Sequence, residues 1–267
     1  MDNTESTIEA RSPAQVYEDV FVPALFEQWA SVISDVAGIL PGQRVLDVAC
    51  GTGVLAHAAA GRVGRQGVVI GLDPNEEMLA VARARSSRIE WQNGRAESLP
   101  HAPASFDRVV SQFGLMFFDD RAAGLREMMR VLRPGGRLVV AVWDAVDHSP
   151  GYAVLAELLQ RLFGPAIAEA FRAPFALGDR STLRSIWDQA GVGNVRIMRS
   201  DGSVRFESIE QLVSAERACV WTLGGLCDGR QFDLLLKEAE ESLRPFAGAD
   251  GSVAFTMPAL VSTVDKD

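Results

Sequence analysis

Residues 45–56, VLDVACGTGVLA, join an apolar run to a glycine turn and then to an alanine-rich segment. The apolar run around Asp47 is typical of a buried strand, and Gly51 and Gly53 suit a tight turn that opens a helix. Parallel strands cannot be joined by a tight hairpin, so a strand that turns into a helix predicts a helical crossover. This unit favours an α/β fold in which helices cover a parallel sheet.

The same alternation of strand and helix continues to about residue 144. Apolar runs rich in Val, Ile and Phe are separated by segments with helical spacing, and the sequence RPGG at 133–136 is a good helix stop. Such a sheet binds ligands at the carboxyl ends of its strands. Strands are expected at 44–50, 67–73, 88–94, 105–113 and 135–144, with helices at 54–63, at about 75–86 and through Leu125, Met128, Met129 and Leu132.

The two ends of the chain predict further helices. Residues 14–37 have helical spacing in two pieces, broken near Pro23. Beyond residue 145 we expect helical stretches that form a cap over the ligand-binding edge of the sheet, although ordinary packing helices fit the pattern equally well. The expected elements are helices at 151–171, 181–191 and mostly over 208–245, and strands at 193–206 and 252–267.

Composition excludes several classes of protein. The 267 residues are 48% hydrophobic and 23% charged, as in a globular protein, and no apolar stretch reaches the roughly 18–20 residues of a membrane helix. The polar, acidic N-terminus does not resemble a secretory signal. A net charge of −9 disfavours a nucleic-acid partner. Cysteines without a CxxC pair and scattered histidines predict no metal site and a cytoplasmic setting.

The charge at the glycine turn narrows the choice of ligand. Residues 51–56 fit G-x-G-x-x-G/A, and Asp73 follows about twenty residues later, as in a dinucleotide fingerprint. In such a site a pyrophosphate binds the loop amides, and a carboxylate at Asp47 would repel it. A cationic ligand reverses that sign. S-adenosylmethionine carries an ammonium and a sulfonium, which favours a methyl donor over a nicotinamide.

The sequence resembles the class I S-adenosylmethionine-dependent methyltransferases, in the UbiE-like branch. The resemblance covers 15–145 in the expected order, and is carried by the motifs VLDVACGTG, VVIGLDPNEEML, NGRAESLP, SFDRVVSQFGLMFF and REMMRVLRPGGRLVVAVW. It implies a Rossmann-like fold with a mostly parallel seven-stranded sheet, flanking helices and a helical cap. It also implies that S-adenosylmethionine is bound and that S-adenosylhomocysteine is the product.

The resemblance also assigns cofactor contacts. One departure from the family pattern is Arg95, which stands where relatives carry an acid that accepts from the adenine amino group. Glu97 or a backbone carbonyl is expected to replace that acid. The implied positions are Asp47, Ala49, Gly51 and Gly53 around the methionine part, Asp73 at the ribose, Pro74 and Met78 near the adenine, Ala96 and Glu97 along the adenine edge, and Gln112 and Phe113 by the methionine and sulfonium.

Fewer residues can be assigned to the methyl acceptor than to the cofactor. His148, after the fifth strand, is a candidate general base, although a loop histidine is more often simply exposed. Tyr17, Trp29 and Trp143 are candidates for the acceptor pocket, and Trp29 fits plain core equally well. Cys50 is expected to be a small buried residue rather than a nucleophile. The apolar cap sequences favour a small, partly apolar acceptor.

The predicted organisation is one structural domain, and two other functions stay open. N-terminal helices at 1–40 would cover the cofactor, residues 41–145 would bind it, and 146–267 would complete the sheet with cap insertions at about 151–178 and 208–247. One alternative is a non-catalytic protein that binds S-adenosylmethionine or S-adenosylhomocysteine. The other is an NAD(P)-dependent oxidoreductase, which Asp47 disfavours. The methylated atom and the oligomeric state cannot be read from the sequence.

Overall fold

A computed structural model describes residues 12–219 and 222–267, and their contacts group them into two compact units. The core unit comprises Phe26–Val142, Leu177–Ser200 and Ala259–Asp267. The helical unit comprises the segments up to Leu25, Trp143–Ala176 and Asp201–Pro258. Residues 1–11, which begin the predicted N-terminal segment, lie outside the described residues. The organisation of the chain into one domain stays a prediction.

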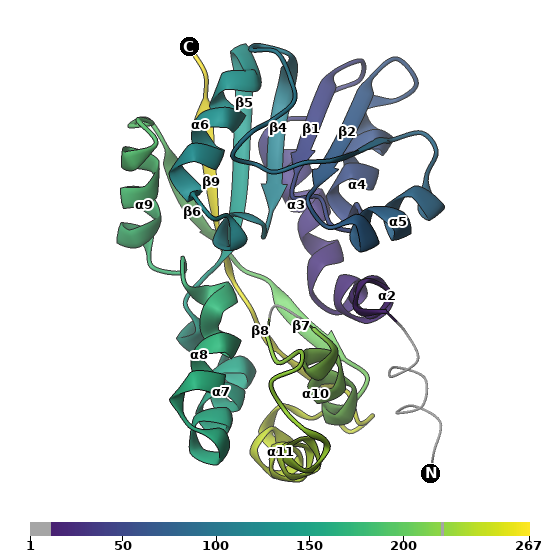
Figure 1. The fold of residues 1–267 in the computed structure, drawn as a ribbon, viewed down its shortest axis with the longest axis vertical. Coiled ribbons are helices and arrows are strands. Elements are labelled where there is room, and N and C mark those ends of the chain that lie inside the picture. The colour runs from purple at the N-terminus through teal and green to yellow at the C-terminus, as the bar shows by residue number, and fades with distance from the viewer. Residues whose placement is uncertain (1–11, 220–221) are drawn as a thin grey trace. The chain divides into compact units, whose positions relative to one another are not determined.

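The core unit is built on a sheet in the strand order β3-β2-β1-β4-β5-β9-β6 (Figure 1). The strands from β3 to β5 run parallel, and β9 is antiparallel to β6. The predicted seven-stranded, mostly parallel sheet is therefore confirmed. The strands are β1 Arg44–Val48, β2 Val68–Asp73, β3 Glu90–Asn93, β4 Phe106–Gln112, β5 Leu132–Trp143, β6 Arg196–Ser200 and β9 Ala259–Asp265.

The direction in which the chain crosses this sheet decides where its helices lie. From β1 the chain moves outward to β2 and β3, and from β4 it moves the opposite way to β5. Since parallel crossovers are right-handed, the helices after β1 and β2 cover one face and the helix after β4 covers the other. Helix α3 packs on α4, and α6 packs on α9. The helices are α3 Glu27–Ala37, α4 Val54–Val63, α5 Glu76–Arg85, α6 Arg121–Val131 and α9 Arg180–Gln189, with a short 3-10 turn, η2, at Leu115–Phe117.

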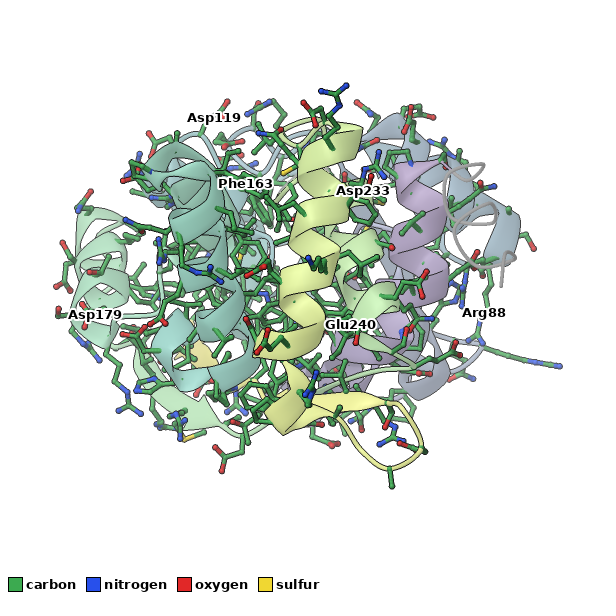
Figure 2. The ribbon with its side chains drawn as sticks, turned by 90° about the horizontal axis from the view of Figure 1, so that it is seen from below. Arg88, Asp119, Phe163, Asp179, Asp233 and Glu240 are labelled. Carbon is green, nitrogen blue, oxygen red and sulfur yellow. The ribbon has the colours of Figure 1, made fainter. Side chains whose placement is uncertain are left out.

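The helical unit combines helices with a two-stranded antiparallel sheet. Helix α11 shows why such a segment folds: Phe232 and Leu235 are buried, while Asp233 and Glu240 are exposed and project outward (Figure 2). The elements are α2 Pro13–Val16, η1 Tyr17–Phe26, η3 Val146–His148, α7 Pro150–Phe163, α8 Pro165–Arg172, η4 Ala173–Phe175, β7 Ser203–Phe206, α10 Ile209–Ala218, α11 Gly229–Ser242, η5 Arg244–Phe246 and β8 Val253–Thr256.

Two predicted strands each divide into two strands of different sheets. The strand expected at 193–206 is β6 and β7, and the strand expected at 252–267 is β8 and β9. The second interruption falls at Met257 and Pro258, where proline has no amide hydrogen for the ladder. The amide of Met257 donates to the carbonyl of Gly202 (2.8 Å). The residue that interrupts β8 and β9 is thus bonded to the residue that interrupts β6 and β7.

Two predicted helices also differ from the structure. The helix expected at 151–171 is α7 and α8, divided at Gly164, whose φ of 86° and following Pro165 end the first helix. The chain does not break near Pro23; it passes through the π-helix η1 instead. The wider turn of a π-helix relieves the clash between a proline ring and the carbonyl four residues earlier. Among the described residues, no helix is both long and apolar enough to cross a membrane.

Candidate active site

The expected ligand position is the point at which the strand order reverses. Strands β1 and β4 are parallel neighbours, with Asp47 opposite Val110, yet the chain visits β2 and β3 between them. The connections that leave β1 and β4 therefore diverge to opposite faces, and sheets of this kind bind their ligands at the carboxyl ends of two such strands. The segments that follow Val48 and Gln112 begin at this position.

Asp47 lies near the end of β1 and is only 1% exposed. Among the described residues, neither of its buried carboxylate oxygens has a hydrogen-bond partner of good geometry. Burial raises the pKa of Asp47 well above its ordinary value; the amide of Ala56 opposes the shift, and the carboxylate of Asp73 adds to it. A buried carboxylate without a partner is costly, so this position is suited to a ligand that brings a positive charge or several hydrogen-bond donors.

Asp73 ends β2, the strand next to β1, and is 7% exposed. Its Oδ2 accepts from the amide of Gly51 (2.9 Å) and its Oδ1 accepts from the amide of Asn75 (2.8 Å). Burial raises the pKa of Asp73. Each oxygen retains a lone pair, so the fixed carboxylate can accept from two adjacent hydroxyl groups, such as those of a ribose.

The chain turns sharply after β1 and after β4. Ala49 and Phe113 have φ values of 58° and 57°, in the left-handed region that non-glycine residues rarely adopt. The two turns touch, since a Cβ on Gly114 would lie 2.5 Å from the Cβ of Ala49. Strained residues of this kind persist where the surrounding structure holds them, and they gather at functional sites.

Gly53 is required for a reason that the sequence did not indicate. Its φ is 94°, and a Cβ there would lie 2.3 Å from the indole of Trp91 on β3. Gly71 approaches the same indole, with 2.5 Å for its Cβ. Gly53 also precedes α4 without a side-chain cap, which leaves amides at the helix N-terminus for other partners. Trp91 therefore packs against the glycine turn and supports it.

Two buried hydroxyls at these strand ends were missed by the sequence analysis, whereas Gln112 was among the predicted contacts. The hydroxyls of Thr52 and Ser111 are buried without hydrogen bonds. Gln112 donates from Nε2 to the carbonyl of Phe26 (3.1 Å), whereas its Oε1 is buried without a partner. A hydroxyl within the apolar run VVSQF was the available signal for Ser111. These groups are the kind that a polar ligand satisfies.

Aromatic rings enclose Phe113. Its ring centroid lies 5.7 Å from those of both Phe26 and Trp29, and the contact with Trp29 is edge-to-face. Trp29 is buried in α3. These rings surround the turn after β4 with apolar surface, which is consistent with both the pocket and the core interpretation of Trp29.

Ala96 and Glu97 lie in the loop that follows β3, and β3 is the neighbour of β2 in the sheet. Ala96 is buried. The Oε1 of Glu97 accepts from the amides of Asp119 (2.8 Å) and Asp120 (3.4 Å), and its Oε2 lies 3.6 Å from Arg95 Nε. Glu97 thus joins this segment to the N-terminus of α6. Of the remaining predicted contacts, Met78 is buried in α5, and the carbonyl of Pro74 accepts from Asn93 Nδ2.

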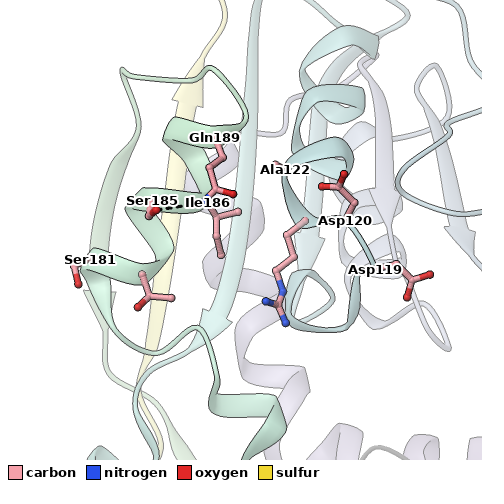
Figure 3. A pocket seen from close by; sticks show the side chains of 9 residues that line it. Asp119, Asp120, Ala122, Ser181, Ser185, Ile186 and Gln189 are labelled. Atoms are coloured by element: carbon pink, nitrogen blue, oxygen red, sulfur yellow. Dashed lines mark hydrogen bonds between the residues drawn. The ribbon is translucent and has the colours of Figure 1, made fainter.

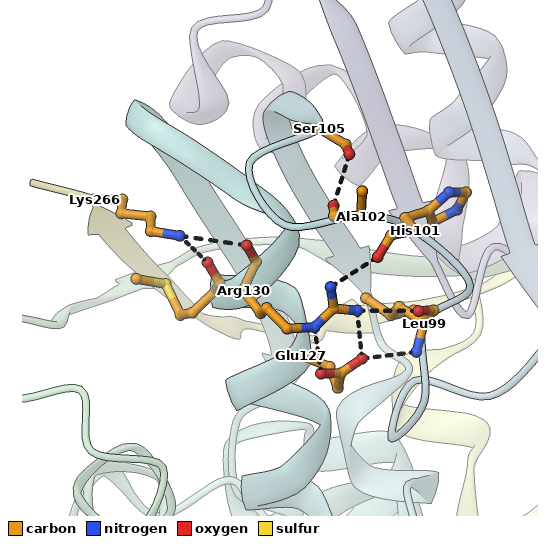
Figure 4. A network of polar contacts seen from close by, with 8 residues as sticks. Leu99, His101, Ala102, Ser105, Glu127, Arg130 and Lys266 are labelled. Atoms are coloured by element: carbon orange, nitrogen blue, oxygen red, sulfur yellow. Dashed lines mark hydrogen bonds and ion pairs between the residues drawn. The ribbon is translucent and has the colours of Figure 1, made fainter.

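A polar network holds the far end of the same segment (Figure 4). Arg130 on α6 donates to the carbonyls of His101 (2.7 Å) and Leu99 (3.0 Å), and it pairs with Glu127 (2.6 Å). Glu127 Oε2 accepts from the amide of Leu99 (3.0 Å). This network fixes the path of the chain between β3 and β4, which carries Ala96 and Glu97.

The remaining predicted site residues belong to the helical unit. Tyr17 begins η1, and Trp143 is buried at the end of β5. His148 has a partner that the sequence did not reveal: its Nδ1 lies 3.1 Å from Oδ2 of Asp144, which is buried and also accepts from the amide of Ala145 (2.9 Å). Their spacing of four residues was the only signal in the sequence.

A separate groove of about 730 Å³ lies between the N-terminal part of α6 and one face of α9 (Figure 3). Asp120 there caps α6, and the hydroxyl of Thr182 bonds to Asp179. The groove is open and its polar groups largely serve the helix ends, so it is a weaker ligand site than the strand ends. It is lined by Asp119, Asp120, Arg121, Ala122, Ser181, Thr182, Ser185, Ile186 and Gln189.

Solved structures share this fold. The YcgJ protein of Bacillus subtilis matches with a TM-score of 0.60 and 19% identity, over 90% of this chain and 99% of that one. Phosphoethanolamine N-methyltransferase 2 of Haemonchus contortus, in complex with S-adenosylhomocysteine, matches with a TM-score of 0.59 and 18% identity, over 99% of this chain and 58% of that one. Both likenesses are likenesses of fold, and the strand order of the core sheet is the feature that they cover.

The family is shown by sequence. Residues 12–204 match the model of the ubiE/COQ5 methyltransferase family, and the chain belongs to that family. A demethylmenaquinone methyltransferase of Renibacterium salmoninarum is 40% identical over 155 residues, which are 57% of this chain and 63% of that relative. The chain thus spans a little less than two thirds of this relative. The predicted membership of the UbiE-like branch is confirmed.

Proposed function

We propose that the chain transfers the methyl group of S-adenosylmethionine to a small, partly apolar acceptor, and that Asp47 binds the positively charged amino-acid part of the cofactor. The observation that carries this proposal is the pair of Asp47 oxygens, buried without partners at the switch point. A cationic ligand would supply the missing partner, whereas a diphosphate would meet a like charge.

The other predicted cofactor contacts follow once the amino-acid part of the cofactor is placed at Asp47. The oxygens of Asp73 have room for the two ribose hydroxyls, and the hydroxyl of Thr52 and Oε1 of Gln112 are unused polar groups beside the turns. We assign Pro74, Met78, Ala96 and Glu97 to the adenosine side, where the hydrogen bonds of Glu97 leave a backbone carbonyl as the simpler acceptor for the amino group. Ala49, Gly51, Gly53 and Phe113 line the methionine side.

The cofactor supplies an activated methyl group on a sulfonium, so the protein's main task is alignment. The strand ends fix the donor, because Asp47 and Asp73 lie on adjacent strands in fixed register. Phe26, Trp29 and Phe113 exclude water from the turn after β4, which favours a displacement in which charge disperses.

Substitution of the two aspartates tests this assignment. We expect Asp47→Asn to weaken S-adenosylmethionine binding by about 10- to 100-fold, since about 1.5–3 kcal/mol belongs to a hydrogen bond with a charged group. Asp73→Ala should weaken it similarly. Asp47→Asn should not lower the free energy of unfolding of the ligand-free protein, because it removes an unpaired buried carboxyl. Isothermal titration and urea unfolding measure both quantities.

Asp233→Asn is the matched control, because Asp233 is exposed on α11, in the helical unit. It should bind the cofactor like the parent. Parental affinity in both Asp47→Asn and Asp73→Ala would show that the cofactor binds elsewhere.

We assign His148 the role of general base for an acceptor that must lose a proton. Asp144 accepts from Nδ1 and thereby leaves Nε2 as the basic nitrogen. His148→Gln is expected to lower kcat by about 10²- to 10⁴-fold with unchanged cofactor affinity. Asp144→Asn should lower kcat by a smaller factor, since it disturbs only the tautomer and the orientation of the ring. If His148→Gln kept the parental kcat with every methylated acceptor, the role would be wrong.

The first acceptor to test is a demethylmenaquinone-type ring, because a relative bears that name. The helices α7, α8 and α10 bury mainly apolar side chains, which suits an acceptor of this kind. A cytoplasmic setting and the absence of a nucleic-acid partner remain predictions from composition.

A further inference from the structure

Trp91 reaches from β3, at one end of the strand order, to the turn that follows β1. Its Nε1 donates to the carbonyl of Ser86 (3.0 Å), which ends α5. Its ring centroid lies 5.8 Å from that of His57, in the second turn of α4. All of these residues belong to the core unit, and the hydrogen bond and the ring contact together fix the orientation of the indole.

The six-membered ring of this indole lies across two glycines. A Cβ on Gly53 would lie 2.3 Å from Cη2 and 2.9 Å from Cζ3 of Trp91, and a Cβ on Gly71 would lie 2.5 Å from the same Cζ3. Neither position could hold a Cβ unless the indole moved. Gly71 lies within β2 and does not have a positive φ, so space, and not backbone conformation, requires glycine there.

The two halves of the glycine turn are held by different groups. In the first half, the amide of Cys50 donates to a carbonyl of β2 (3.1 Å), and the amide of Gly51 donates to Oδ2 of Asp73 (2.9 Å). In the second half, Gly53 has a φ of 94° and gives α4 no side-chain cap. From outside the turn, Gly53 is held by the indole of Trp91. The position at which α4 begins therefore depends on the indole.

We propose that Trp91 is a positioning residue for the cofactor: its indole holds Gly53 and the start of α4 in place, and it thereby sets the affinity for S-adenosylmethionine and S-adenosylhomocysteine. In metal sites, replacing a residue that orients a ligand without touching the metal weakens binding by about 10- to 100-fold. The same reasoning applies to a residue that supports a binding turn. The inference rests on the proposed function in taking the glycine turn as part of the cofactor site.

Gly71→Ala tests this role while it leaves both the turn and the indole chemically unchanged. Its methyl group would displace the indole, and with it the surface that supports Gly53. We expect calorimetric titration of the full chain to show about tenfold weaker binding of S-adenosylhomocysteine. In a Trp91→Leu background the same substitution should weaken binding by no more than about threefold, because the clash with Cζ3 is gone and only Cys50 Sγ, 3.0 Å from that Cβ, remains. The same factor in both backgrounds would overturn the proposal.

Gly67→Ala is the matched control, because it introduces a similar clash just before the opposite end of β2. A Cβ on Gly67 would lie 2.3 Å from the Cβ of Val63. This variant should unfold at a lower temperature than the parent, as Gly71→Ala should, but it should bind S-adenosylhomocysteine with the parental affinity. Each titration is run at a temperature at which the variant is folded. If Gly67→Ala weakened binding as much as Gly71→Ala, the loss would reflect lower stability and the proposal would fail.

Trp91→Leu by itself separates a positioning role from a structural one. We expect the folded variant to bind S-adenosylhomocysteine about tenfold more weakly than the parent. If Trp91 only stabilised the fold, the variant would unfold at a lower temperature and still bind with the parental affinity, and the proposal would fail. No binding of S-adenosylhomocysteine to the parent would contradict the proposed function instead, so the two failures are distinguishable.

Discussion

At the scale of single residues, the site combines two features that lower the stability of the fold. Asp47 places a carboxyl in the interior without partners, and Ala49 and Phe113 hold the backbone in the left-handed region. Each such feature costs of order 1–3 kcal/mol and persists only when the surroundings enforce it. All three lie at the ends of β1 and β4, beside the switch point. The stability lost there is consistent with a site shaped for a ligand.

The backbone strain at Ala49 can be measured. We expect Ala49→Gly to raise the free energy of unfolding by up to about 1 kcal/mol, because glycine adopts a φ of 58° without a Cβ clash. Urea unfolding of the ligand-free protein measures the change.

Ala80→Gly is the control for this substitution, since Ala80 is exposed within the helix α5 and does not have a positive φ. It should lower the free energy of unfolding by about 1 kcal/mol. Destabilisation of similar size in both variants would mean that Ala49 is not strained.

At the scale of elements, a lysine after the last strand caps the C-terminus of α6. Nζ of Lys266, just after β9, donates to the carbonyls of Met129 and Leu132 (2.6 Å each), at the C-terminus of α6. Figure 4 shows Lys266 beside Arg130, whose carbonyl lies 3.4 Å from Nζ. A cation at this end of a helix meets unpaired carbonyls and the negative end of the helix dipole. Arg130 and Glu127 of α6 hold the loop after β3, so the cap on α6 also stabilises that loop.

Removal of this cap should be costly. We expect Lys266→Met to lower the free energy of unfolding by about 1–3 kcal/mol, since it leaves carbonyls that are partly buried without their donor. The control is Lys237→Met, at an exposed position in α11, which should change it by no more than about 0.5 kcal/mol. Equal effects would mean that the helix end does not depend on Lys266. Urea unfolding at constant pH provides the comparison.

At the scale of the whole molecule, ligand binding should stabilise the core unit. S-adenosylmethionine or S-adenosylhomocysteine at about a hundred times its dissociation constant should add roughly 2.7 kcal/mol. For a chain of this size that corresponds to a rise of about 5–10 °C in Tm. NAD(H) at the same concentration should produce no shift, because its diphosphate would meet Asp47. Differential scanning calorimetry measures each shift, and stabilisation by NAD(H) alone would contradict the site.

The core unit was largely predictable because its signals are local. Strand and helix alternate over 44–144 with clear hydrophobic periods, so the parallel sheet and the helix at Val54–Val63 followed directly. The second sheet was not predictable. Its strands β7 and β8 lie about fifty residues apart in the sequence. Asp201 and Gly202 mark an interruption between β6 and β7, but they do not indicate that the two halves belong to different sheets, and β8 leads into β9 through Met257 and Pro258. Only the tertiary pairing decides which sheet each half joins.

The candidate site divides in the same way. By itself the sequence determined that an acidic residue precedes the glycine turn and that a second ends the next strand, because position along a parallel sheet follows from chain order. The tertiary structure decided that the carboxylate of Asp47 has no partner among the described residues, and that Trp91 supports the turn. Burial and the absence of partners depend on neighbours that are distant in the chain, and local pattern carries no record of them.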